Sequence, residues 1–153
     1  MTIPETDSLP LDTRPARRSA WRAQLPVVAV VALGGGAGAA ARYAVALWWP
    51  TGAGGFPWAV FGANVIGCAV IGVFLVAVTE ARTAHPLVRP FFGTGVLGGF
   101  TTFSTYAVDI HDLIDAGHPG TALAYLAATL LAALTAVWLA TTAARRVLLG
   151  RQR

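Results

Sequence analysis

Four long runs of apolar residues, separated by short polar or glycine- and proline-rich segments, account for most of this chain. The runs cover residues 27–49, 57–78, 88–108 and 121–143. About 20 helical residues cross a bilayer core that is about 30 Å thick, so each run is long enough to span a membrane. The pattern therefore predicts an all-α membrane protein with four transmembrane helices.

The third run differs from the others because it is poor in leucine and rich in glycine and hydroxyl residues. From Gly93 to Tyr106 it reads GTGVLGGFTTFSTY. Glycine frees the backbone from regular helix, and threonine and serine hydroxyls can replace the hydrogen bonds that are then lost. At membrane depth such a break is tolerated only where it is buried in protein or lines a polar cavity. We therefore predict that the third helix is broken at Gly98–Thr101.

The segments outside the runs are polar and basic. Residues 1–24 predict a disordered basic N-terminal tail, residues 25–146 a single four-span domain, and residues 147–153 a basic C-terminal tail. The pair Arg17-Arg18 before an apolar run is also typical of an export signal. However, the run at 27–49 is longer than the apolar part of a signal peptide, about 7–15 residues, so we expect a retained first span.

The composition agrees with a membrane protein. Of 153 residues, 56% are hydrophobic and only 12% are charged, whereas a soluble domain has about 25% charged residues. The 11 basic residues, all arginine, outnumber the 7 acidic ones. In so apolar a chain this excess indicates membrane orientation rather than nucleic-acid binding. The single cysteine, Cys68, excludes an intrachain disulfide.

The arginines lie on one side of the predicted membrane topology. With four spans, both termini and the loop at 80–89 share a side, and ten of the eleven arginines belong to them. These are Arg14, Arg17, Arg18, Arg22, Arg82, Arg89, Arg145, Arg146, Arg151 and Arg153. Because basic segments stay in the cytoplasm, we expect a multi-pass protein of the inner (plasma) membrane with both termini cytoplasmic.

Two polar residues inside the spans are functional candidates. Arg42 is the only charge deep in a span, where it costs several kcal/mol unless it is paired; the alternative is that it reaches the headgroups beside Trp48 and Trp49. Asn64 is the one strongly polar residue of the second run. Its alternative role is an interhelical hydrogen bond, worth about 0.6–2 kcal/mol.

The remaining chemistry argues against an enzyme and against proton coupling. Ser104 has no histidine or acid beside it in the sequence, so a nucleophilic site is unsupported. No carboxylate lies within a span, although a proton-coupled transporter normally needs one. The segment 109–120 carries Asp109, His111, Asp112, Asp115 and His118. Their spacing matches no tight metal site, and we interpret the segment as a solvated acidic loop.

The polar groups left inside the membrane suit small ions. One cation, several hydroxyls, an amide and the positive edges of aromatic rings would stabilise an anion. Backbone carbonyls freed at the predicted break would instead suit a small hard cation. The third run therefore predicts anion and cation subsites close together.

Three segments resemble the signature sequences of the Fluc/CrcB fluoride channels. They are GGGAGAAARY at Gly34–Tyr43, GANVIG at 62–67 and GGFTTFSTY at Gly98–Tyr106. The match continues through all four spans in the same order. The resemblance implies an antiparallel dimer of four-helix subunits with two narrow pores. Through these pores fluoride leaves the cytoplasm passively, which reduces its toxicity; no enzymatic step is implied.

The resemblance also implies roles for single residues. The carbonyls of Gly98 and Thr101 would hold a structural sodium ion that is not transported, and Arg42 would act electrostatically. The residues implied for the fluoride pore are Asn64, Phe103, Ser104, Thr105, Tyr106 and Thr129. Tyr106 replaces the usual phenylalanine and Thr129 the usual serine. The Tyr106 hydroxyl has three open possibilities: to donate to fluoride, to obstruct the pore or to point away.

Alternatives remain for function and for assembly. A four-helix drug-exporting antiporter would need an acid in a span, and a noncatalytic membrane scaffold would use the glycine-threonine break only for packing. The ten-to-zero arginine bias fixes one orientation, whereas an antiparallel homodimer requires insertion both ways. We therefore expect a dimer with an inverted homologous subunit, with a homodimer as the alternative.

Overall fold

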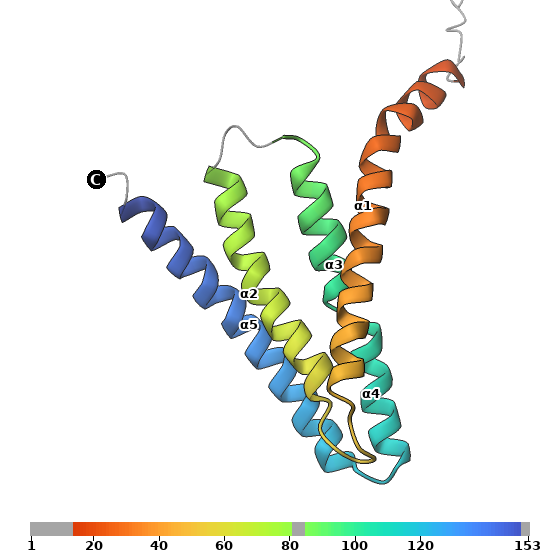
Figure 1. The fold of residues 1–153 in the computed structure, drawn as a ribbon, viewed down its shortest axis with the longest axis vertical. Coiled ribbons are helices and arrows are strands. Elements are labelled where there is room, and N and C mark those ends of the chain that lie inside the picture. Colours follow the sequence, from red (N-terminus) through yellow and green to blue (C-terminus); the bar gives the residue numbers. More distant parts are fainter. Residues whose placement is uncertain (1–13, 81–84, 151–153) are drawn as a thin grey trace, which may run out of the picture.

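The computed structural model describes residues 14–80 and 85–150, and within them every regular element is helical (Figure 1). The elements are α1 (Arg14–Trp48), α2 (Trp58–Glu80), the π-helix η1 (Arg89–Leu97), α3 (Gly98–Phe100), α4 (Ser104–Asp115) and α5 (Pro119–Gly150). The predicted all-α fold is confirmed for these residues.

Within the described ranges, three helices are long and apolar enough to cross a membrane: Gln24–Trp48, Trp58–Thr79 and Pro119–Leu148. They confirm the first, second and fourth predicted spans as helices. The third predicted span is absent from this set because it is divided among η1, α3 and α4. In Figure 1, the start of α1 and the end of α5 lie at one end of the bundle, and the loop at 49–57 lies at the other.

The third run is broken, but further along the chain than predicted. Gly98–Phe100 is helical, and the interruption covers 101–103, where Thr101 is extended with φ −78° and ψ 154°. The glycines serve close packing instead of the break: a Cβ at Gly99 would collide with the backbone of Gly35 on α1. The hydroxyl residues that follow then supply the side-chain hydrogen bonds of a broken helix.

The predicted tails are also corrected. Helix α1 begins at Arg14, so the prediction of disorder is wrong for 14–24, and α5 continues to Gly150, beyond the predicted start of the C-terminal tail. Four arginines and three alanines lie among the eleven residues 14–24, and both residue types are good helix formers. The rest of the predicted tails, 1–13 and 151–153, lies outside the described residues.

Helix α1 packs closely against η1 and α3 through glycines. Gly34 and Gly38 have the GxxxG spacing that is typical of close contacts between membrane helices. A Cβ on Gly95 of η1 would lie 3.0 Å from the Cα of Gly34. A Cβ on Gly38 would collide with the carbonyl oxygen of Val96 and lie 2.8 Å from the amide nitrogen of Phe100. This contact fixes α1 beside the break.

We expect Gly38→Ala to destabilise the protein, because the obstructing atoms belong to the backbone and cannot rotate away. Overpacking of this kind costs about 1–3 kcal/mol and sometimes more. Gly36→Ala is the matched control, since a Cβ at Gly36 has nothing within 4 Å. Thermal unfolding of the two variants in detergent checks the prediction. Equal melting temperatures would show that α1 does not approach η1 this closely.

Candidate functional site at the helix break

Asn64 on α2 binds the backbone of the break. Its Nδ2 donates to the carbonyl oxygen of Thr102 at 3.0 Å, and its Oδ1 accepts from the Thr102 N–H at 2.8 Å. The side chain is only 7% exposed. The amide thus replaces both helical partners that Thr102 has lost. Because an asparagine amide carries two N–H donors, one remains beyond the bond to Thr102.

Arg42 on α1 also turns toward the break rather than toward the membrane surface. Its Nε donates to the carbonyl oxygen of Gly99 at 3.4 Å, and its Nη1 donates to Thr105 Oγ1 at 3.1 Å. The first acceptor belongs to α3 and the second to α4. The guanidinium therefore joins the two helical segments on either side of the interruption.

Hydroxyl groups complete the local structure. Thr101 Oγ1 donates to the carbonyl of Leu97 at 3.0 Å. Thr102 Oγ1 accepts from the Thr105 N–H at 3.1 Å and donates to Thr105 Oγ1 at 3.2 Å; it also lies 3.3 Å from Ser104 Oγ. A hydroxyl that accepts from an amide three residues later caps the first turn of a helix, so Thr102 caps α4.

The carbonyl groups of this segment divide into two sets. The carbonyl of Gly99 accepts from Arg42, that of Thr102 from Asn64 and that of Phe103 from the Ala107 N–H. Among the residues that the structure describes, none donates a hydrogen bond to the carbonyl oxygen of Gly98 or Thr101. These two oxygens are available to a ligand.

An open groove of about 590 Å³ runs between α2, the break and α5. It is lined by six of the predicted site residues, together with Cys68 and apolar residues of α5. The six are Asn64, Gly98, Thr101, Phe103, Tyr106 and Thr129. The two remaining pore candidates, Ser104 and Thr105, do not line it. The structure therefore brings six of the predicted site residues together at one groove and leaves Ser104 and Thr105 outside it.

The groove combines aromatic rings with a free hydroxyl. The ring centroids of Phe103 and Tyr106 are 5.8 Å apart, and Phe103 is 79% exposed. Thr129 is only 6% exposed, and its buried hydroxyl has no hydrogen-bond partner among the described residues. A buried hydroxyl without a partner is unusual, and this one lines the groove.

The hydroxyl of Tyr106, whose role the sequence leaves open, is hydrogen-bonded within the chain. Its hydroxyl donates to the carbonyl of Leu126 on α5 at 3.0 Å. Its ring lies 5.2 Å from that of Tyr125, centroid to centroid. This bond holds the Tyr106 ring against α5, beside the groove that Tyr106 lines.

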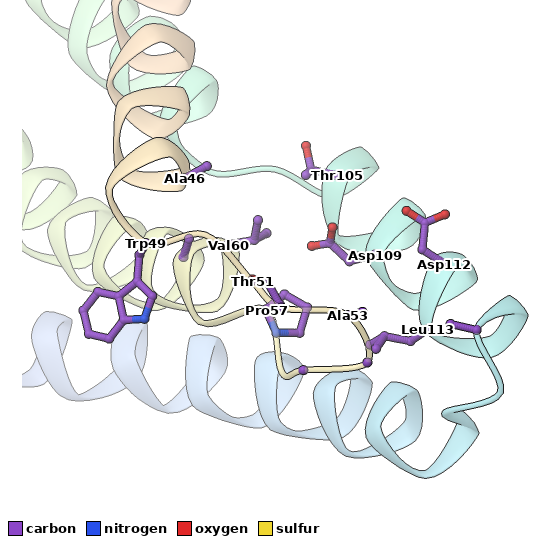
Figure 2. A pocket seen from close by; sticks show the side chains of 15 residues that line it. Ala46, Trp49, Thr51, Ala53, Pro57, Val60, Thr105, Asp109, Asp112 and Leu113 are labelled. Carbon is purple, nitrogen blue, oxygen red and sulfur yellow. The ribbon is translucent and has the colours of Figure 1, made fainter.

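A second cavity of about 410 Å³ lies between α4 and the loop at 49–57. Figure 2 shows Thr105, Asp109 and Asp112 of α4 beside it. Asp109 Oδ2 accepts from the Tyr125 hydroxyl at 3.1 Å. Burial raises the pKa of the Asp109 carboxyl, the bond from Tyr125 opposes this rise, and the charge of Asp112 adds to it. The same cavity is lined by Thr105, on the first turn of α4 after the break.

The helical structure of this segment contradicts the prediction of an acidic loop over 109–120. Helix α4 continues to Asp115, and only 116–118 connect it to α5. The residues at 105, 109 and 112 recur at helical spacing, a signal that would have placed Asp109 beside Thr105. Within the described residues, no group of three or more His, Cys, Asp or Glu side chains could hold a metal.

Comparison with known proteins gives a consistent result over most of the chain. The family described as "CrcB-like protein, Camphor Resistance (CrcB)" matches residues 29–141. "Fluoride-specific ion channel FluC 1" of Streptomyces coelicolor is 71% identical over 154 residues, which cover 99% of each chain. "Fluoride-specific ion channel FluC 2" of Streptomyces avermitilis is 68% identical over 158 residues, which cover 100% of each. A FluC 2 of Nocardia farcinica is 55% identical over 119 residues, 78% of this chain and 85% of the relative.

Proposed function

Because this chain belongs to the CrcB-like family, we infer that it is a fluoride-specific ion channel, a multi-pass membrane protein and not an enzyme. The observation that carries the inference is the groove at the helix break, where an amide, a free hydroxyl and two aromatic rings line one surface. The channel exports fluoride from the cytoplasm by passive flow, which reduces fluoride toxicity.

Fluoride flux from liposomes tests this function. The chain is co-purified with the inverted homologous subunit proposed below and reconstituted in vesicles loaded with potassium fluoride. Valinomycin is added, and a fluoride electrode records the efflux. We expect rapid efflux of fluoride and none of chloride from matched vesicles. A drug-exporting antiporter or a scaffold would release no fluoride, and that result would overturn the inference.

The groove is proposed as one wall of the fluoride pore. Fluoride is small and strongly hydrated, so several donors must replace its water at once. The second N–H of Asn64 and the Thr129 hydroxyl would donate to it, and the ring edges of Phe103 and Tyr106 would face it with their positive rims. Ser104 and Thr105 are proposed to contact the ion on the other side of the break.

A second subunit is proposed to cover this groove and so complete the pore. Phe103 is 79% exposed in the single chain, and a narrow pore needs the groove covered. An antiparallel partner would supply that cover and a symmetry-related second pore. Large exposed apolar faces on α1 and α5 leave room for such a contact beside the lipid.

Sodium is proposed as a structural ion between the subunits. The carbonyl oxygens of Gly98 and Thr101 fit this role, because they belong to neighbouring turns and have no donor among the described residues. Backbone oxygens are ligands that hard cations prefer. The bound ion would supply positive charge that draws four carbonyls together, without being transported.

Replacing sodium by N-methyl-D-glucamine is expected to weaken the dimer. A ligand that binds only the assembled form stabilises it by mass action, about 2.7 kcal/mol at one hundred times its dissociation constant. Thermal unfolding in sodium and in N-methyl-D-glucamine measures the effect, and potassium serves as a control with the same charge and a larger radius. A melting temperature indifferent to the cation would remove the sodium site and leave the fluoride pathway standing.

Orientation is proposed to be fixed, with both termini in the cytoplasm of the inner membrane. Ten arginines lie in the terminal segments and at 80–89, and none lies in the segments between the other helix ends. So strong a bias sets one orientation. The active form is then a heterodimer with an inverted homologous subunit, and a homodimer is the alternative.

Labelling of the 49–57 loop tests the orientation. The substitution Thr51→Cys is made in a Cys68→Ala background, and intact cells are treated with a membrane-impermeant maleimide. We expect labelling from the outside only. Equal labelling from both sides, or full fluoride flux from this chain alone, would support the homodimer instead.

A further inference from the structure

Arg42 bonds to both halves of the broken helix. Its Nε reaches the carbonyl of Gly99 in α3 at 3.4 Å, and its Nη1 reaches the hydroxyl of Thr105 in α4 at 3.1 Å. The extended residue Thr101 and its two successors lie between these acceptors. Asn64, by contrast, holds only the middle of the break, at Thr102.

The backbone that carries Arg42 is itself fixed against α3. One turn earlier on α1, a Cβ on Gly38 would lie 2.8 Å from the amide nitrogen of Phe100. The guanidinium is planar and presents its donors in a rigid fork. Because the Arg42 backbone is fixed and its guanidinium is rigid, the position of α1 determines the position of Thr105. Thr105 belongs to the first turn of α4, so α1 also positions that turn.

The partners of Arg42 are neutral oxygens. The one close contact between a basic and an acidic side chain in the described part of the chain joins His111 Nδ1 to Asp115 Oδ2, at 3.2 Å on the surface. Two of the guanidinium donors are used by the break, and both bonds depend on geometry more than on net charge. A lysine would keep the charge but could not hold both acceptors with the same fork.

We propose that Arg42 is a positioning residue of the channel: its bonds to Gly99 and Thr105 fix the two helix halves relative to one another, and so place Phe103 and Tyr106 against Asn64. The proposal rests on the fluoride pore proposed above. It assigns to Arg42 a role through the protein backbone, in place of attraction of the ion at a distance.

A double-mutant cycle between Arg42 and Thr105 tests the proposal in flux. We expect Arg42→Lys and Thr105→Val each to lower fluoride efflux about tenfold, since each removes a hydrogen bond between a charged group and a neutral oxygen. The double variant should lose far less than the hundredfold product of the two single losses, because both changes remove the contact between Arg42 and Thr105. Thr105→Ser keeps the hydroxyl and should restore the flux. Normal flux in Arg42→Lys, or losses that multiply to about a hundredfold, would overturn the proposal.

A distance measurement keeps the proposal testable without flux. In a Cys68→Ala background, spin labels are attached to cysteines introduced by Phe92→Cys on η1 and Ile114→Cys on α4, two exposed positions. The distance between the labels reports how the two parts of the broken helix are placed relative to one another. We expect a narrow distance distribution that Arg42→Lys and Thr105→Val broaden equally. Thr142→Val, which removes a hydroxyl bonded within α5, is the control and should leave it narrow. An unchanged distribution in Arg42→Lys would exclude the positioning role, whereas absent fluoride efflux from the unaltered protein would refute only the channel function.

Discussion

Replacing Asn64 by alanine is expected to lower fluoride efflux by a factor of about 30 or more. The change leaves the N–H and the carbonyl of Thr102 without partners in a buried place. Each such group costs about 1–3 kcal/mol, and every 1.4 kcal/mol corresponds to a factor of ten. The break would relax to recover these bonds, and the pore would lose an amide donor as well. Liposome efflux normalised to folded protein measures the loss.

Two further variants separate the roles of the amide. Asn64→Asp keeps an acceptor for the Thr102 N–H but removes both donors, so we expect it to fold better than Asn64→Ala and still conduct poorly. Thr79→Val, on the same helix, removes a hydroxyl that bonds only to Leu75 and should conduct normally. Wild-type flux in Asn64→Ala would remove this residue from the pathway.

The sequence indicated the break but not its boundaries. Glycines and threonines both signal departure from helix, and in GGFTTFST they are adjacent. The structure separates their roles: Gly99 allows α1 to approach, whereas Thr101 and Thr102 accept and donate the bonds that end one helix and begin the next. Local propensity cannot distinguish a glycine needed for packing from one needed for conformation, because only the tertiary contact decides.

The sequence identifies the polar candidates Arg42 and Asn64 individually, but it does not identify their hydrogen-bond partners. Arg42 and Asn64 stand out because polar residues inside apolar runs are costly. Their acceptors at Gly99, Thr105 and Thr102 lie on another helix, and helical periodicity fixes only which residues share a face. The sequence therefore predicted an ion-facing role for Arg42, while the structure shows contacts with the broken helix.

The prediction of a loop over 109–120 fails for a related reason. The aspartates indicate contact with water, but a helix can also expose them to water. Leu113 of α4 nevertheless packs with Ala122 and Tyr125 of α5, and Ile110 packs against this cluster. Ile110 and Leu113 are three residues apart, which is a helical spacing, and their packing continues α4 beyond Asp109. Asp109 therefore contacts Tyr125 from a helix and not from a loop.

Gly67→Ala is expected to impair the channel severely, because Gly67 makes the room in which the break lies. An added Cβ would collide with Cγ2 of Thr101 and lie 3.4 Å from Cδ1 of Phe100. Thr101 cannot rotate away freely, since its hydroxyl donates to Leu97 at 3.0 Å. Helix α2 would move instead, and Asn64, one turn earlier on the same helix, would leave Thr102. We expect a loss of stability of about 1–3 kcal/mol and a still larger relative loss of flux.

The comparison with Gly62→Ala makes this test specific. Gly62 lies on the same helix, and a Cβ there has nothing within 4 Å, so alanine should be neutral or stabilise by about 0.5–1 kcal/mol. Adding Thr101→Ser to Gly67→Ala removes the obstructing methyl group and keeps the hydroxyl bond to Leu97, and should therefore restore both the melting temperature and the fluoride efflux. If Gly67→Ala behaved like Gly62→Ala, or if Thr101→Ser restored stability without flux, the contact between α2 and the break would not set the geometry of the pore.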